Sequence, residues 1–587
     1  MLRILFYLIT AFISLQCFAL PARQGILHAL QPDGTIVNIR MEGNAEHKRI
    51  YSEDGYLLTT DSLGFYVFAD SNKEGEIIPS EIKAINPGKR NPETLNKISS
   101  LHQTGLTDSY KIKEPEENIS QYAKGLGLGI TKFPSFGEHR SLVILVEFSD
   151  KGFTIENPKE FYTRMLNEPG FSYGGATGSA RDYFISNSNG IFIPQFDVYG
   201  PVVLEKPYSY YGRNSIWGED SNPWDMVIEA CKVLDDEVDF SLYDQNEDGF
   251  IDNVYIFYAG YGEADGGGAN TIWPHSFDIT AITRRPYKFD DVRLDHYACS
   301  NELQKFNNDM PDGIGTFCHE FSHVLGLPDL YSTTYNNAFT PSNWDILDQG
   351  SYNNYSRTPP NYSSYERFAL DWINPEILYD DDEILLNPLD ETNEAFIVMT
   401  DKDNEYFLFE NRQQRGFDEF LPGHGMLIWH IDFNLRKWMN NTVNNTPSHQ
   451  NVDLIEADDK KDWETLSGDA FPGTENVNEF SCQTVPSFVS WDNVNMPLRL
   501  YDISEDKNGI IRLSVEECKM AGMSKNRSED LDMIFIEGNT VGCKDGVAEI
   551  FKINGNKVAT LQNTTIELPS GIYIVVIKDR GFKFLIP

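Results

Sequence analysis

The sequence predicts a multidomain α+β protein: an α/β domain, then an all-β sandwich-like domain, then a small C-terminal β domain. Its 587 residues are too many for one hydrophobic core. Two continuous apolar runs, at 139–150 and 252–262, are typical of buried central strands, and a helical pattern lies between them. From about residue 376, short strand-like segments dominate. These observations together give the predicted order of domains.

The N-terminus has the features of a secretory signal peptide over residues 1–22. Arg3 precedes an apolar run that is too short to span a bilayer, and small residues follow at Ala19 and Ala22. We expect cleavage near one of these alanines. A lipoprotein anchored through Cys17 is the alternative. No later apolar run is long enough to cross a membrane, so the sequence predicts an exported protein, either secreted or attached to the cell surface.

The remaining chain divides by changes in pattern. Alternating apolar and polar segments such as "DGTIVNIRMEG" predict strands in the N-terminal region, and a polar stretch over about 86–121 predicts a linker. The predicted boundaries are 23–135 for the N-terminal pro-region with its linker, 136–375 for the α/β domain, 376–520 for the sandwich-like domain and 530–587 for the C-terminal β domain.

Charge narrows the class of partner. The formal net charge is −41 and the pI about 4.5. Such a surface argues against nucleic acid, whose phosphates require a basic face, and against an anionic membrane surface. It suits an exported soluble protein or one that binds cations.

The segment "TFCHEFSHVLGLPDLY", residues 316–331, carries the strongest chemical signal. On a helix, His319 and His323 lie one turn apart on the same face and can reach one metal ion. Glu320 projects beside them and can act on a water bound there. The alternative is a half-buried helix that carries two histidines by chance.

The residues after this pair predict a third ligand. Gly326 can end the helix in a left-handed conformation, and Pro328 prevents it from resuming, so that Asp329 can turn back to the metal. The result is the long zinc-binding pattern of the metzincin proteases, with Asp in the last place. The rival third ligand is a downstream glutamate, Glu366; alternatively Asp329 only caps a helix or a turn.

Two positions further on bear on the same site. Metzincins place a methionine in a tight turn beneath the metal, and Leu347 in "SNWDILDQGSYN" stands there instead. Leucine is a comparable apolar filler. Tyr352 could hydrogen-bond a tetrahedral intermediate, although a packing role is the simpler interpretation.

The segment "DQNEDGFID", residues 244–252, matches a calcium-binding loop with Gly249 at its sixth position. The twelfth position is Tyr255 and not Glu, so the pattern is not a complete EF-hand. An Asx-rich turn is the alternative. The predicted calcium ligands are Asp244, Asn246, Asp248, the carbonyl of Phe250, and Asp252.

Several segments together resemble the immune inhibitor A family of secreted bacterial metalloproteases. They are "HEFSHVLGLPDLY", "WDILDQGSYNN", "PPNYSSYERFALDW" and "GHGMLIWHID", and the resemblance covers about Arg140 to Glu517. It implies zinc-dependent endopeptidase activity on proteins or peptides, a preceding pro-segment and structural calcium. It also implies zinc ligation by His319 and His323, with Glu320 as general base. Leu347 departs from the pattern.

The two ends of the chain extend this resemblance. The region before Arg140 resembles a propeptide. It has no cysteine after the signal, which excludes a cysteine switch, and an Asp or Glu switch is the open alternative, with no residue assigned to it. The tail, with "AEIFKINGNKV" and "LPSGIYIVVI", resembles the sorting domains of the type-nine secretion system, which implies recognition by secretion machinery. A plain β module is the alternative.

Two further patterns give hypotheses. The six cysteines after the signal are scattered without a C-x-x-C pair, which argues against a cysteine zinc site, and a Cys299–Cys318 disulfide is one hypothesis. The glycine-rich "GYGEADGGGAN", residues 260–270, is a candidate rim of a substrate cleft.

The leading prediction is therefore an exported zinc endopeptidase, in which water activated by the metal attacks the peptide bond and Glu320 is the general base. The alternative is a catalytically silent, calcium-binding surface adhesin on the same fold.

Overall fold

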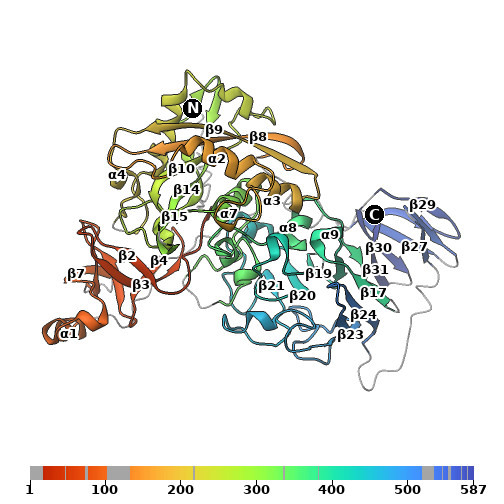
Figure 1. Ribbon diagram of the computed structural model, residues 1–587. Helices are drawn as coiled ribbons and strands as arrows, with labels where there is room; N and C mark the ends of the chain where they lie inside the picture. The colour runs from red at the N-terminus through yellow and green to blue at the C-terminus, as the bar shows by residue number, and fades with distance from the viewer. Residues whose placement is uncertain are drawn as a thin grey trace, which may run out of the picture.

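The computed structural model describes residues 18–586 except 102–132, 519–533 and the short gaps 46–47, 73–76, 216–217, 308, 335–337, 381–382, 403, 538, 545–546, 553–556, 570 and 578–579. Figure 1 shows separate β-rich parts at the two ends of the chain and a larger central part between them. Most of the predicted signal peptide, residues 1–17, lies outside the described residues.

The N-terminal region forms an antiparallel six-stranded sheet, in which each strand pairs with the next along the chain. Its strands are β2 (Leu27–Leu30), β3 (Ile36–Gly43), β4 (Lys48–Ser52), β5 (Leu57–Thr60), β6 (Tyr66–Ser71) and β7 (Ile77–Lys83). Helix α1 (Pro92–Ser99) lies within the first part of the predicted linker, and the part of that linker from residue 102 onward lies outside the described residues. Asn91 caps this helix by accepting from the Thr94 N–H at 2.8 Å, and Pro92 fits its first position.

A mixed sheet forms the centre of the molecule, in the order β1-β11-β14-β10-β8-β9, with β15 beside β14. Strands β8, β9, β10 and β14 run parallel, whereas β1, β11 and β15 are antiparallel to their neighbours. The strands are β1 (Phe18–Ala19), β8 (Gly137–Glu147), β9 (Phe192–Val203), β10 (Val254–Tyr261), β11 (His275–Asp278), β14 (His296–Gln304) and β15 (Met310–Pro311). The two apolar runs of the sequence are thus the adjacent inner strands β8 and β10.

Helices cover both faces of this sheet. Because side chains alternate along a strand, Tyr255 and Phe257 of β10 face one core while Val254 and Ile256 face the other. The first core includes α2 (Pro158–Asn167), α3 (Ala180–Asn187) and α7 (Ile314–Val324); the second includes α5 (Pro223–Leu234). Smaller elements complete this part: α4 (Tyr208–Gly212), α6 (Ile279–Thr283), α8 (Ser364–Ala369), β12 (Tyr287–Phe289) and β13 (Val292–Leu294).

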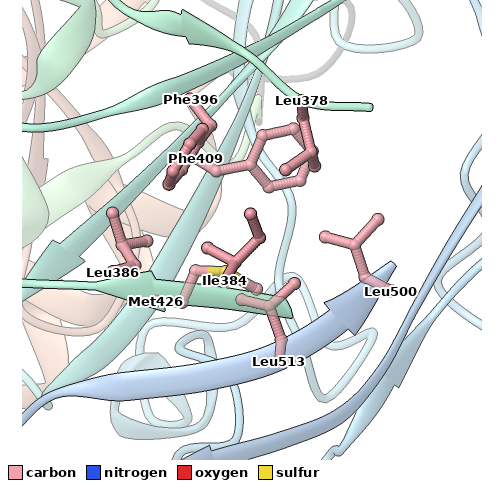
Figure 2. Close-up of a pocket in the computed structure, with 8 residues that line it drawn as sticks. All are labelled: Leu378, Ile384, Leu386, Phe396, Phe409, Met426, Leu500 and Leu513. Atoms are coloured by element: carbon pink, nitrogen blue, oxygen red, sulfur yellow. The ribbon is translucent and has the colours of Figure 1, made fainter. Parts of the chain in front are cut away.

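Two further sheets follow the central one. The five-stranded sheet contains β16 (Glu376–Ile377), β18 (Phe396–Met399), β19 (Glu405–Arg412), β20 (Gly425–Asp432) and β21 (Val452–Leu454); the four-stranded sheet contains β17 (Glu383–Leu386), β24 (Ile511–Glu517), β23 (Leu498–Glu505) and β22 (Glu479–Phe480). Their apolar side chains share one core, and Figure 2 shows Phe409 and Met426 from the first sheet opposite Leu500 and Leu513 from the second. Short helices α9 (Leu389–Thr392) and α10 (Leu435–Met439) lie in the connections.

The C-terminal part consists of two small sheets around their own core, which includes Val541, Ile550 and Leu561. One sheet contains β25 (Ile534–Glu537), β26 (Thr540–Cys543) and β29 (Thr565–Glu567); the other contains β28 (Lys557–Leu561), β27 (Ala548–Lys552), β30 (Gly571–Ile577) and β31 (Arg580–Ile586). Among the described residues, none of the helices has the length and apolar character needed to cross a bilayer.

The hypothesis of a Cys299–Cys318 disulfide is wrong. Both thiols are free, because Cys299 on β14 packs into the core on one face of the central sheet and Cys318 on α7 packs into the other. The disulfide instead joins Cys482 to Cys518 beside the four-stranded sheet.

Candidate active site

Helix α7 holds both histidines of the motif and is buried along its whole length. Its first turn lies against the turn at residues 349–352. A Cβ atom on Gly315 would lie 2.0 Å from the Ser351 carbonyl oxygen, so only glycine allows this approach. The buried, glycine-fitted helix therefore fixes His319 and His323 rigidly on one face.

The helix ends as the sequence predicts. Gly326 has φ +95°, its N–H donates to the His323 carbonyl at 2.9 Å, and the Leu327 N–H donates to the Ser322 carbonyl at 3.0 Å. These two bonds form a Schellman motif, which requires the left-handed residue that glycine supplies. The chain then reverses and brings Asp329 back to the histidines.

His319, His323 and Asp329 offer three ligand atoms to one point. The two Nε2 atoms are 3.2 Å apart, and Asp329 Oδ1 is 3.3 Å from His319 Nε2 and 3.2 Å from His323 Nε2. In a tetrahedral zinc site with ligand distances of about 2.0–2.1 Å, neighbouring ligand atoms are about 3.3–3.4 Å apart. Asp329 Oδ1 is buried and has no hydrogen-bond donor. The geometry therefore fits zinc.

Backbone carbonyls orient the two imidazoles. His319 Nδ1 lies 2.7 Å from the Ile346 oxygen, and His323 Nδ1 lies 2.8 Å from the Leu327 oxygen. A carbonyl can only accept, so each Nδ1 carries the proton and each Nε2 lone pair faces the shared point. Burial lowers the pKa of His319, which favours the neutral form that binds metal.

Asn441, which sequence reasoning missed, orients the third ligand. Its Nδ2 donates to Asp329 Oδ2 at 2.5 Å, and its Oδ1 accepts from the Asp329 N–H at 2.8 Å. Burial by itself would raise the pKa of Asp329, but the neighbouring His323 and His319 hold it below its usual value. Nothing in the local sequence indicates this contact, because Asn441 lies 112 residues further along the chain.

Glu320 lies on the same helix and is fully buried. Its Oε1 accepts from the Leu20 N–H at 2.9 Å, while Oε2 has no hydrogen-bond partner. Burial, reinforced by the charge of Asp329, raises its pKa well above the usual value. Such a carboxyl group can exchange a proton near neutral pH.

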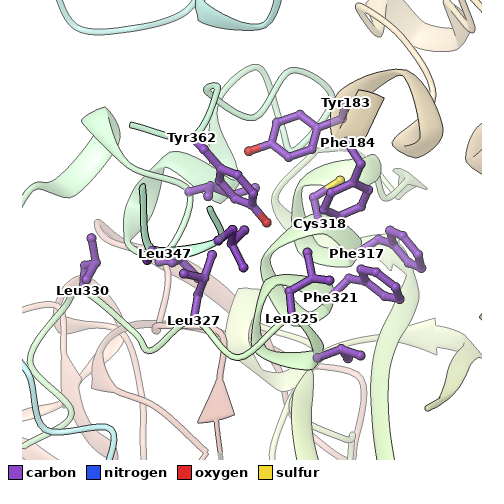
Figure 3. Packing of buried hydrophobic residues seen from close by; sticks show 14 of the residues in the cluster. Tyr183, Phe184, Phe317, Cys318, Phe321, Leu325, Leu327, Leu330, Leu347 and Tyr362 are labelled. Carbon is purple, nitrogen blue, oxygen red and sulfur yellow. The ribbon is translucent and has the colours of Figure 1, made fainter. Parts of the chain in front are cut away.

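Leu347 directly follows Ile346, whose carbonyl pairs with His319 Nδ1. Figure 3 shows it in the apolar cluster with Leu327, Leu330 and Tyr362. It is fully buried, and its carbonyl accepts from the Leu330 N–H at 2.9 Å. Leu347 thus packs as an apolar core residue next to the segment that orients His319.

The rival third ligand, Glu366, is placed elsewhere. It belongs to α8, where its Oε2 accepts from the Ser363 N–H at 2.7 Å in a capping box. Among the described residues, the group of side chains that could together hold a metal ion consists of His319, His323 and Asp329.

The N-terminal segment crosses this site. Strand β1 pairs antiparallel with the edge strand β11, and Phe18 stacks on the His323 ring with 4.8 Å between centroids. Beyond the strand, Trp273 Nε1 donates to the Leu20 carbonyl at 2.8 Å, and the Tyr352 hydroxyl donates to the Pro21 carbonyl at 2.8 Å. Tyr352 therefore faces the same space as Glu320. The predicted acidic latency group has no counterpart among the described residues of the N-terminal region, since none of them joins the metal-ligating group.

The candidate calcium loop forms a compact Asx turn. Asp244 Oδ1 and Oδ2 each lie 3.0 Å from backbone nitrogens, those of Asp248 and Gly249, and Asp252 Oδ1 is buried without a partner. Burial raises the pKa of Asp252 to about 6. Asn246 Oδ1 also accepts from the Asp248 N–H at 3.0 Å. The oxygens predicted as ligands are thus largely engaged with the loop's own backbone.

The chain is similar in sequence to known proteins. The pre-pro-metalloprotease PrtV of Vibrio cholerae serotype O1 is 29% identical over 269 residues, which cover 39% of this chain and 26% of PrtV. Immune inhibitor A of Bacillus thuringiensis subsp. alesti is 26% identical over 250 residues, 36% of each chain. The chain thus matches only about a quarter to a third of these relatives. Residues 135–374 match the family described as immune inhibitor A peptidase M6, catalytic domain, so this part of the chain is similar to that domain.

Proposed function

We propose that this protein is an exported zinc-dependent endopeptidase with a metzincin-like catalytic domain that hydrolyses peptide bonds of proteins. The observation that supports this most is the triangle of 3.2–3.3 Å formed by His319, His323 and Asp329, with the buried Glu320 beside it. The names of the two relatives, which describe a pre-pro-metalloprotease and an immune inhibitor, are in accord with this activity.

In this proposal, His319, His323 and Asp329 hold zinc, and Glu320 moves the proton. Bound zinc would polarise the scissile carbonyl and make a nearby water more acidic. Glu320 takes the proton from the attacking water and passes it to the leaving amine. The free Oε2 of Glu320 suits this role. Tyr352 donates to the oxygen that carries the developing negative charge, as its hydroxyl now does to the Pro21 carbonyl at 2.8 Å.

The N-terminal region, residues 23–135, acts as a pro-region. Signal-peptide cleavage after Ala19, one of the two expected positions, leaves Leu20 to Ala22 attached to it, and this short segment blocks the cleft. Leu20 donates its N–H to Glu320, and the Gln349 side chain donates to the Ala22 carbonyl at 3.1 Å. An extended chain bound in this way excludes both substrate and water. Latency therefore comes from occupation of the cleft, and activity requires removal of this region. The name of PrtV describes a pre-pro-protein, in accord with this order of events.

Calcium and sorting are the further parts of the proposal. Asp244, Asn246, Asp248, Asp252 and the Phe250 carbonyl would bind calcium after their side chains turn away from the loop's own backbone. Added calcium should then raise Tm in the wild type and not in Asp248→Ala. The domain boundaries predicted from sequence beyond residue 22 are kept, and the domain at 530–587 serves recognition by the secretion machinery, for release or attachment at the cell surface.

The test combines metal content with activity. After processing, the wild type should contain about one zinc per chain and hydrolyse casein, and a zinc chelator should abolish the activity. Glu320→Ala should bind zinc but lose at least about a thousandfold in rate. The matched control is Glu160→Ala, at an exposed position of α2. Casein hydrolysis that persists in Glu320→Ala would refute the mechanism. A folded protein that lacks both zinc and activity would favour the silent adhesin.

A further inference from the structure

The N-terminal region inserts one lysine into an acidic pocket of the catalytic domain. Lys48, the first residue of β4, has a side chain only 5% exposed, and its Nζ lies 2.5 Å from Glu263 Oε2 and 2.9 Å from Asn214 Oδ1. Asn214 Nδ2 in turn donates to Glu263 Oε1 at 2.8 Å. Glu263 itself is fully buried. The pocket thus binds the ammonium group between the oxygens of Glu263 and Asn214, and the hydrogen bond between these two side chains holds both in place.

Trp273 joins this pocket to the catalytic cleft. Lys48 Nζ lies 5.1 Å from the centre of its indole ring, a distance suited to a cation–π contact. The Nε1 atom of the same ring donates to the Leu20 carbonyl, next to the peptide nitrogen that binds Glu320. One side chain therefore forms a wall of both spaces. The pocket lies beside the positions that flank the catalytic glutamate.

A second carboxylate reinforces the charge of the pocket. Asp220 Oδ2 accepts from the backbone N–H of Trp273 at 2.8 Å, while Asp220 Oδ1 is buried without a hydrogen-bond partner among the described residues. Burial raises the pKa of both Asp220 and Glu263, and the charge of Lys48 opposes this rise. When the N-terminal region leaves, both carboxyl groups lose their cation. The emptied pocket then favours another cation.

The pocket is also built on the glycine-rich loop that faces the N-terminal region. Glu263 lies within this loop, residues 260–270, and a Cβ on Gly268 would lie 2.6 Å from the Leu30 carbonyl oxygen. The loop therefore contacts the N-terminal sheet directly. Removal of the N-terminal region would therefore expose the loop and the pocket together.

From these contacts we propose that the pocket of Glu263, Asn214, Asp220 and Trp273 is a specificity subsite for a basic side chain of the substrate, and that Lys48 occupies it before activation. The inference rests on the proposed peptidase function. Lysine fits best, because a compact ammonium can meet two acceptors and an aromatic face at one point, whereas arginine needs a planar, two-pronged partner. Protein substrates with lysine at one position beside the cleaved bond are thus preferred.

The test uses the full-length protein, loaded with zinc and processed until N-terminal sequencing shows that the N-terminal region is gone. The processed protein digests a diverse peptide mixture, and mass spectrometry identifies the new termini. Lysine should be enriched at one fixed position. In a matched peptide pair, replacement of that lysine by the isosteric norleucine should lower kcat/KM by about ten- to hundredfold.

Variants locate the effect. The double variant Lys48→Gln with Glu263→Gln keeps a hydrogen bond between the two amides, so the unprocessed chain can still fold. After processing it should cleave norleucine and lysine peptides equally well. Glu237→Gln, an exposed site beyond α5, is the control and should keep the lysine preference.

The outcomes separate this inference from the function on which it rests. Absence of any peptide cleavage by processed, zinc-loaded wild type would refute the proposed function and this subsite with it. Cleavage without lysine preference would overturn the subsite alone and leave Lys48 as an anchor of the N-terminal region. A preference that survives in the double variant would also overturn it. The peptide pair tests the wild type directly, even if the double variant fails to fold.

Discussion

Replacement of Asn441 by alanine should weaken zinc binding without removing a ligand. Its side chain makes two hydrogen bonds with Asp329, at 2.5 Å to Oδ2 and 2.8 Å from the backbone N–H. Together these bonds aim Oδ1 at the two histidines. Without them the carboxylate can rotate, and its buried Oδ2 loses its donor. Partners of this kind typically change metal affinity by about 10- to 100-fold, or about 1.4–2.7 kcal/mol.

The measurement is competition for zinc between the protein and a chromophoric chelator. The control is Asn434→Ala, which removes the exposed cap of the neighbouring helix α10 and should cost about 1 kcal/mol of local stability without affecting the metal ligands. Far-UV circular dichroism and gel filtration verify the fold. If Asn441→Ala binds zinc as tightly as the wild type within twofold, Asp329 is not oriented in this way.

Three further predictions concern the rest of the chain. Lys48→Met leaves a buried carboxylate uncompensated, so the N-terminal region should be lost faster during processing, as followed on denaturing gels; an unchanged rate would argue against this anchor. Replacement of Cys482 and Cys518 by serine should destabilise the protein by about 2–4 kcal/mol in urea, whereas equal stability under reducing and non-reducing conditions would argue against this disulfide. Burial raises the pKa of Asp469 to about 8, so Tm should fall as the pH rises from about 5 to about 8; Asp469→Asn should flatten that fall, and an equally steep slope would contradict the assignment.

Local sequence patterns were sufficient to predict the structure wherever residues close together in the chain determine it. The apolar runs that became β8 and β10 are buried on both faces, and a parallel central strand requires such a run. The end of α7 was equally local, because Gly326 must be left-handed for the chain to turn back toward the histidines. Asp329 could therefore be placed near His319 and His323 from spacing alone.

Long-range contacts could not be predicted in this way. Asn441 meets Asp329 from 112 residues away, and Leu20 meets Glu320 from 300 residues away. The proposed disulfide failed for the same reason, since the sequence does not reveal which face of the sheet each cysteine occupies. Helix α1 was missed because its composition is polar and only Ile98 is buried. Its capping residue, Asn91, was the one local signal that could have identified it.

X-ray absorption spectroscopy at the zinc edge, on the wild type and on Asp329→Ala, tests the proposed site most directly. The wild type should have two imidazole nitrogens and a carboxylate oxygen at about 2.0–2.2 Å and no sulfur. Asp329→Ala should retain the two imidazoles and lose the carboxylate. A sulfur ligand in the wild type, or the same carboxylate signal in Asp329→Ala, would contradict a zinc site built from His319, His323 and Asp329.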